Sequence, residues 1–163
     1  MRRIIQIEAH AKFLQIAKRV SLGSNCVRGQ VGVVLVQGGK IVSTGWNGVP
    51  TSFRDCLSAG CPRCKHRTST GRGYDRCICV HAEQSAIATA ARNGIPLRSA
   101  TMYVNLRPCL GCLNLALTAG VRKIVYEVSW TYPSNIEAAY ERIAKRLSSF
   151  LRVDSRRNKA GIR

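Results

Sequence analysis

Hydrophobic and polar positions follow two different periods along the chain. In residues 4–20 the apolar side chains recur at the spacing of an amphipathic helix. Two runs rich in β-branched residues follow, 30–36 and 40–46, and Gly38-Gly39 joins them. Two such runs around a Gly-Gly turn are typical of a β-hairpin. We therefore expect the chain to begin with a helix and a hairpin.

The second half of the chain alternates between the two periods. The expected elements are helices over 82–94, 110–120 and 135–151 and strands over 101–106 and 123–128. Strands that alternate with helices after an initial hairpin predict an α/β fold. We expect a three-layer α/β/α sandwich with a mixed sheet of about five strands.

The chain length and the distribution of apolar residues predict one domain. The sequence has 163 residues, which we divide into a domain over 1–153 and a basic tail over 154–163. No run of 18 or more residues is apolar, and polar residues interrupt the N-terminal helix, so we expect neither a membrane span nor a signal peptide. The expected location is cytoplasmic, with no membrane partner. Residues 47–80 show no period, and a loop of this length is usually functional or held by a metal.

Eight cysteines are many for a chain of this size. In a reducing compartment such cysteines are more often metal ligands than disulfide partners. Their spacing supports this reading, because six of them form two C-x-x-C pairs and one C-x-C pair. The pairs are Cys61 with Cys64, Cys109 with Cys112, and Cys77 with Cys79.

One histidine and two of these cysteines have the spacing of a catalytic zinc site. His81, Cys109 and Cys112 offer one nitrogen and two sulfurs, which leaves a fourth zinc position for water. Glu83 lies two residues after His81 and can move protons without being a ligand. The pattern H-x-E followed by P-C-x-x-C is the signature of zinc nucleobase deaminases. The alternative, that these are ordinary packing residues, is weak because both halves fall at helix starts with a strand between them.

The motifs resemble those of the deoxycytidylate (dCMP) deaminase family, which has the cytidine deaminase fold. The resemblance covers residues 5–130 and includes "RGQVGVVLV", "IVSTGWNGVP", "CVHAEQSAIATAARNG" and "TMYVNLRPCLGC". It implies a zinc-dependent hydrolase that converts dCMP to dUMP and releases ammonia. It also implies a small-molecule nucleotide as partner and assembly as a homo-oligomer, a hexamer in the family.

The same resemblance suggests four substrate-binding residues. They are Asn47, the backbone of Ala82, Trp130 and Arg28. Asn47 also fits a simple turn before glycine, and Trp130 or the neighbouring Tyr132 also fits a core position. The chain departs from the family at Ser85, where relatives carry Asn, and at Gly29, where relatives often carry a second Arg. These departures leave the phosphate preference less determined than the deamination.

Six cysteines remain outside the catalytic pattern. Four of them could hold a second, structural zinc, which some relatives have in this region. The candidates are Cys26, Cys56, Cys61, Cys64, Cys77 and Cys79. Buried free thiols are the alternative, since free cysteine packs as a small hydrophobic residue. We favour the metal because a loop rich in Lys and Arg has few apolar side chains with which to order itself.

The formal net charge of +18 attracts partners that carry phosphate. It leaves open a deaminase that acts on cytosine or adenine in DNA or RNA, a pathway-specific deaminase of another cytosine nucleotide, and a catalytically silent zinc-binding or nucleic-acid-binding module. The nucleotide-type "TGWNGVP" segment favours a free nucleotide, and the presence of Glu83 disfavours the silent module. Nucleic acid is therefore not the favoured partner.

Overall fold

The computed structural model describes residues 2–49, 52–65 and 76–154. Its helices and strands are, in chain order, α1 (Arg2–Ser21), β1 (Gly32–Gln37), β2 (Lys40–Trp46), α2 (Pro62–Lys65), α3 (Ala82–Arg92), β3 (Thr101–Leu106), α4 (Leu110–Thr118), β4 (Lys123–Val128), α5 (Ser134–Ala144) and β5 (Ser149–Arg152). No helix in these ranges combines the length and apolar character needed to cross a membrane.

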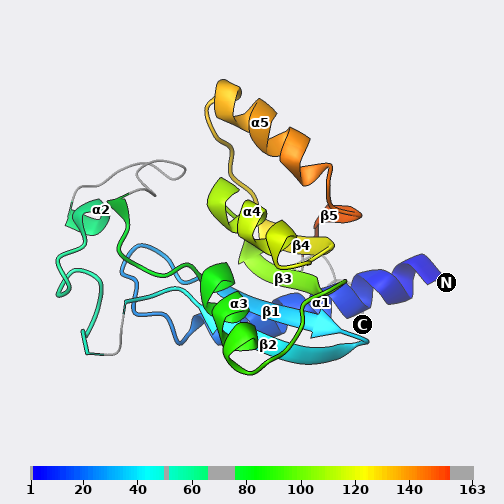
Figure 1. Ribbon diagram of the computed structural model, residues 1–163, viewed down its shortest axis with the longest axis horizontal. Coiled ribbons are helices and arrows are strands. Elements are labelled where there is room, and N and C mark those ends of the chain that lie inside the picture. Colours follow the sequence, from blue (N-terminus) through cyan, green and yellow to red (C-terminus); the bar gives the residue numbers. More distant parts are fainter. Residues whose placement is uncertain (1, 50–51, 66–75, 155–163) are drawn as a thin grey trace, which may run out of the picture.

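The five strands form one mixed sheet in the order β2-β1-β3-β4-β5 (Figure 1). β1 pairs antiparallel with both β2 and β3, whereas β3, β4 and β5 run parallel. The β1–β2 turn is the predicted hairpin, and Gly38 and Gly39 both have positive φ angles, 53° and 77°. Such angles suit the tight turns whose twist matches paired strands.

Helices cover both faces of the sheet, which confirms the three-layer sandwich. On one face, α3, α4 and α5 bury a core with β1, β3 and β4 that includes Ala86, Leu113 and Tyr140. On the other face, α1 packs Leu14 and Ala17 against side chains of β1 and β3. The helix layer packs closely on the sheet at Gly45 of β2. A Cβ added at Gly45 would lie 2.3 Å from the backbone nitrogen of Ala86 in α3.

The C-terminal part of the predicted fold needs a correction. The helix expected over 135–151 ends at Ala144, and Ser149–Arg152 forms the edge strand β5 beside β4. The apolar period continues through this segment, but Ser148 donates both its backbone amide and its hydroxyl to the carbonyl of Arg122 and so turns the chain onto the sheet. The segment between β2 and α3, expected to be loop, contains the single-turn helix α2.

Candidate active site

The starts of two helices bring the predicted zinc ligands together. His81 precedes α3 and Cys109 precedes α4, and both have extended backbones, with ψ angles of 155° and 167°. The His81 amide donates to Gln84 Oε1 at 2.8 Å, which fixes the first turn of α3. Cys112 lies in the first turn of α4, three residues after Cys109, so both sulfurs face the same side.

The three donor atoms have the spacing of a tetrahedral zinc site. His81 Nδ1 lies 3.4 Å from Cys109 Sγ and 3.4 Å from Cys112 Sγ, and all three atoms lie within 4.8 Å of one another. Zinc bonds of about 2.0 Å to nitrogen and 2.3 Å to sulfur place such donors about 3.6 Å apart. One imidazole and two thiols in this geometry fit zinc, and they leave a fourth position for water.

The three donor groups shift one another's pKa values. The hydrogen bond from Cys112 is the main cause that lowers the pKa of the Cys109 thiol to about 4, and the same contact raises the pKa of Cys112. The hydrogen bond to Cys109 raises the pKa of His81 to about 10. A zinc ion held here would compete with protons for these groups, so its affinity is expected to fall as pH falls.

Glu83 lies beside the donors in the first turn of α3. Its side chain is buried, with 3% of its surface exposed, and burial raises the pKa of the carboxyl to about 7. A carboxyl that titrates near neutral pH can both accept and donate a proton during a reaction at that pH. Glu83 therefore has the protonation behaviour of a general acid and base.

A cavity of about 150 Å³ opens next to these groups. Its lining includes His81, Glu83 and Cys109, together with Ala82 and Asn47. Glu83 is the only acidic side chain among the described residues that line it, whereas three arginines do so. The cavity thus combines a metal site with a positively charged wall.

The Asn47 side chain lines the cavity and also forms hydrogen bonds with nearby backbone groups. Its Oδ1 accepts from the amide of Val31 at 2.7 Å, and its Nδ2 donates to the carbonyl of Gly29 at 2.9 Å. These bonds fix the segment that leads into β1. Ala82 is fully buried against the cavity, as expected for a backbone contact. Substrate contacts at both residues stay predictions.

Arginine side chains from two distant segments face the cavity. Arg28, named by the resemblance, lines it together with Arg63 of α2. Arg28 Nη1 donates to the carbonyl of Arg63 at 3.1 Å, which joins the two segments. Sequence reasoning missed Arg63, because it lies in an aperiodic loop. The one available signal was its place inside the C-x-x-C pair.

Trp130 is not among the described residues that line the cavity. Its Nε1 donates to the carbonyl of Arg107 at 2.7 Å, and its ring packs edge-on against Tyr132 with centroids 4.5 Å apart. Arg107, which sequence reasoning also missed, lines the cavity and forms an ion pair with Glu137 of α5. Trp130 and Tyr132 therefore contact the backbone on either side of Cys109, at Arg107 and Leu110, and a stacking role for Trp130 stays a prediction.

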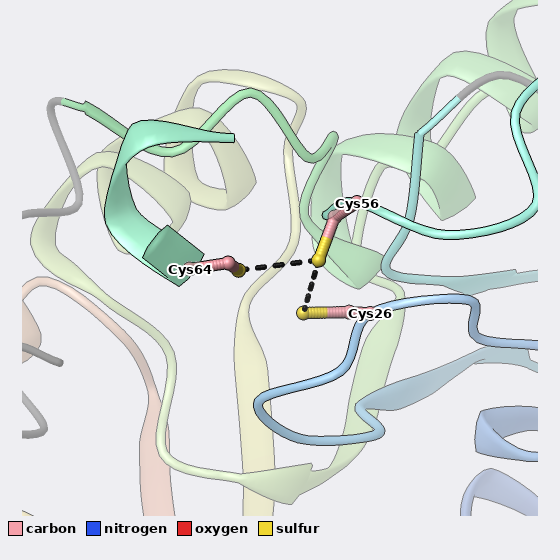
Figure 2. Close-up of side chains that lie close together, drawn as sticks. All are labelled: Cys26, Cys56 and Cys64. Atoms are coloured by element: carbon pink, nitrogen blue, oxygen red, sulfur yellow. Dashed lines mark hydrogen bonds between the residues drawn. The ribbon is translucent and has the colours of Figure 1, made fainter. Parts of the chain in front are cut away.

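A second group of donor atoms is built from three of the six remaining cysteines (Figure 2). Cys56 lies at its centre, with its sulfur 3.1 Å from that of Cys64 and 4.0 Å from that of Cys26. Tetrahedral zinc–sulfur bonds of about 2.3 Å place sulfurs about 3.8 Å apart. These distances exceed an S–S bond of about 2.0 Å. All eight cysteines are free.

The other three cysteines lie beside this group, and two of them, Cys77 and Cys79, also line the cavity. A hydrogen bond with Cys79 lowers the pKa of Cys26 to about 5. Cys77 is bonded to Cys79 and to His81, and its pKa falls to about 3, chiefly through the bond with Cys79. Cys61 contacts Cys64. Cys61 thus neighbours Cys64 and Cys79 neighbours Cys26, so these two are the candidates for a fourth sulfur ligand.

The α/β/α fold and the zinc-type donors define a class of zinc-binding protein. Comparison with known families identifies the family within this class. Residues 7–128 match the family described as the cytidine and deoxycytidylate deaminase zinc-binding region, and the chain belongs to this family. The fold agrees with the dCMP deaminase of cyanophage S-TIM5, solved in complex with dCMP and dUMP. The TM-score is 0.65 at 23% identity, over 90% of this chain and 97% of that one.

Several relatives are named deoxycytidylate deaminase, among them proteins of a yeast and of a phage. The protein of Schizosaccharomyces pombe is 32% identical over 139 residues, 85% of this chain and 43% of its own length. The protein of Mycobacterium phage D29 is 36% identical over 122 residues, 70% of this chain and 90% of its own length. The chain thus spans less than half the length of the yeast relative and most of the phage relative. The predicted family is confirmed.

Proposed function

We propose that the protein hydrolytically deaminates dCMP to dUMP and releases ammonia. The observation that carries the proposal is the cavity that joins the donors His81, Cys109 and Cys112 to the buried carboxyl of Glu83. The family, with its relatives named deoxycytidylate deaminase, supports the substrate class. The arginines at the cavity wall support a substrate that carries phosphate.

The residues divide the reaction between them. Zinc, when bound by His81, Cys109 and Cys112, supplies a Lewis acid that lets water lose a proton near neutral pH. Glu83 accepts one proton of the attacking water and delivers it to the ring nitrogen N3, and it then passes the second proton of that water to the amino group, which leaves the cytosine ring as ammonia. A C–O bond forms as the C–N bond breaks, so that one water is consumed and one ammonia is released. The buried environment of Glu83 keeps its proton affinity suited to both transfers.

A substrate panel tests the assignment. Ammonia release is measured for cytidine, CMP, dCMP, dCTP, single-stranded DNA and tRNA with zinc-loaded protein. We expect dCMP to have the highest kcat/KM. Turnover of DNA or RNA without turnover of dCMP would overturn the proposal in favour of a polynucleotide deaminase, which the charge of +18 would then serve. A preference for another cytosine nucleotide would indicate a pathway-specific deaminase.

We also propose a second, structural zinc in the cysteine cluster of Cys26, Cys56 and Cys64. Three sulfurs within 4.8 Å of one another support it, as does the proximity of Cys79 to Cys26 and of Cys61 to Cys64, which makes Cys61 and Cys79 the candidates for the fourth ligand. Closed structural sites hold zinc with four such ligands and no water. Elemental analysis should give two zinc ions per chain. A value of one in fully loaded protein would refute the structural site and leave the catalytic site standing.

Assembly and location complete the proposal. A homo-oligomer, a hexamer by resemblance to the family, is expected, and light scattering of the purified chain measures its mass. A cytoplasmic location is supported by eight cysteines that are all free, which suits a reducing compartment.

A further inference from the structure

Two of the three arginines that line the cavity, Arg28 and Arg63, lie next to the cysteine cluster of Cys26, Cys56 and Cys64. Arg28 follows Cys26 by two residues, and Arg63 immediately precedes Cys64 in α2. Cys56 joins the two segments, because its sulfur lies 4.0 Å from Cys26 Sγ and 3.1 Å from Cys64 Sγ (Figure 2). Residues 35 positions apart in sequence are thereby brought to one wall of the active site.

Backbone bonds around the cysteine cluster reinforce this connection. The amide of Val27, between Cys26 and Arg28, donates to Cys56 Sγ at 3.4 Å, and the amide of Cys56 donates to the carbonyl of Asn25 at 3.3 Å. Arg28 then reaches the carbonyl of Arg63. Because α2 has only four residues, its own hydrogen bonds do little to fix its position, and the sulfur contacts supply much of the restraint.

The burial of Arg63 sets it apart from the other cations of this loop. Only 9% of Arg63 is exposed and it lines the cavity, whereas the side chain of Arg54 in the same loop is 88% exposed. A guanidinium held in a cavity offers two parallel N–H donors, which match the oxygens of a phosphate. The only acidic side chain among the described lining residues, Glu83, lies with the zinc donors. The part of the cavity wall that carries the arginines is thus suited to an anion. The part that carries the zinc-type donors is suited to the nucleobase.

We propose that the cysteine cluster is the scaffold of a phosphate subsite. It holds Arg28 and Arg63 in place for the 5′-phosphate of a nucleotide, so that recognition of the phosphate depends on the cluster and on Arg63, while the base is recognised elsewhere in the cavity. This inference rests on the proposed deamination of a nucleotide at the same site. It makes the second metal a determinant of nucleotide over nucleoside binding, in addition to any contribution to folding.

Binding to an inactive variant tests the subsite directly. In zinc-loaded Glu83→Gln protein, dissociation constants for dCMP and deoxycytidine are measured by calorimetry, and their ratio gives the contribution of the phosphate. Adding Arg63→Gln should reduce the preference for dCMP by about tenfold or more, as expected for a lost charge-assisted hydrogen bond. Arg54→Gln removes the same charge from the same loop at an exposed position and should leave the ratio unchanged. An equal effect of both variants would overturn the proposal.

Variants of the cysteine cluster test the coupling. Cys56→Ser should lose one zinc ion per chain by elemental analysis and reduce the dCMP preference as Arg63→Gln does. Combining Cys56→Ser with Arg63→Gln should add little, because both act on the same contact. A cluster variant that loses the zinc but keeps the dCMP preference would overturn the coupling. If Cys56→Ser does not fold, Cys26→Ser at the edge of the cluster provides the same two measurements.

Failure of this inference is distinguishable from failure of the proposed function. Ammonia release by the wild-type protein decides whether dCMP is a substrate at all. If dCMP is deaminated but the binding ratio does not respond to Arg63→Gln, the phosphate subsite is wrong and the function stands. If dCMP is not deaminated, the proposed function is wrong.

Discussion

At the scale of single residues, the proposed function assigns the proton transfers to Glu83. It is buried beside the zinc donors, and its pKa is raised to about 7 by burial. Glu83→Gln should retain the fold and the zinc, because Glu83 is not a ligand, but should lower kcat by about 10²- to 10⁴-fold. Glu141→Gln, at an exposed position of α5, is the matched control. Ammonia release and elemental analysis check both variants, and near-normal turnover in zinc-loaded Glu83→Gln would contradict the assignment.

A second residue-scale prediction concerns Glu137 in α5. Its carboxylate pairs with the buried Arg107 and accepts from the amide of Tyr132 at 2.9 Å. The hydrogen bond from Arg107 is the main cause that lowers the pKa of Glu137. A lowered folded-state pKa stabilises the protein above the unfolded value of about 4.3, and this stability is lost as pH falls through the folded-state value.

Glu137→Gln should therefore reduce the free energy of unfolding at neutral pH, by roughly 3 kcal/mol, because it leaves the Arg107 cation buried without its partner. The gap to wild type should narrow as pH falls below about 4. Urea unfolding at several pH values measures this difference, with Glu141→Gln again as the control. A gap that stays constant down to low pH would show that the ion pair does not contribute in this way.

At the scale of elements, α3 is positioned by its close approach to β2. A Cβ at Gly45 would lie 2.3 Å from the nitrogen of Ala86 and 2.6 Å from the carbonyl oxygen of Ala82. Gly45→Ala should therefore displace α3, destabilise the fold by about 2 kcal/mol or more, and weaken zinc binding at His81. Gly111→Ala in α4 is the control, because a Cβ there meets no atom within 4 Å.

The control should change stability in the opposite direction. Alanine is preferred to glycine inside a helix by about 1 kcal/mol, so Gly111→Ala should raise the midpoint of thermal unfolding. Scanning calorimetry measures whether the midpoint of thermal unfolding rises or falls in each of the two variants. If Gly45→Ala proved as stable as Gly111→Ala, close packing of α3 on β2 would not be what positions His81.

The sequence predicts those elements best whose signals are local. The strands 101–106 and 123–128 match β3 and β4, and the candidate zinc site is predictable because His81 with Glu83, and Cys109 with Cys112, each lie within one helical turn. The strand β5 is missed because the apolar period of α5 continues past Ala144, while pairing with β4 depends on contacts distant in sequence. Arg63 is missed for the same reason, since contacts with residues distant in sequence, such as Arg28, bring α2 to the cavity.

At the scale of the whole molecule, the charge exceeds what a nucleotide site requires. The net charge is +18, and residues 140–163 contain eight Lys or Arg and two acids. A pocket for one nucleotide needs only a few cations, such as the arginines of the cavity. The remaining charge is suited to weak, salt-dependent contacts with polyanions.

We therefore expect deletion of residues 154–163 to leave dCMP turnover unchanged while weakening nonspecific DNA binding, most clearly at low salt. Residues 155–163 lie outside the described part of the chain, and the domain boundary at 153 stays a prediction. Kinetics and DNA titrations of the truncated protein check it. Loss of turnover in a folded, zinc-loaded truncation would mean that the tail completes an active site.

The most direct test of the central claim follows the conversion of dCMP itself. Zinc-loaded protein of the full 163-residue sequence is incubated with dCMP, and the nucleotides and ammonia are quantified together. We predict one dUMP and one ammonia for each dCMP consumed, with loss of the activity on chelation and its return with zinc. Failure of fully zinc-loaded, folded protein to convert dCMP, together with deamination of another substrate or of none, would contradict the assignment.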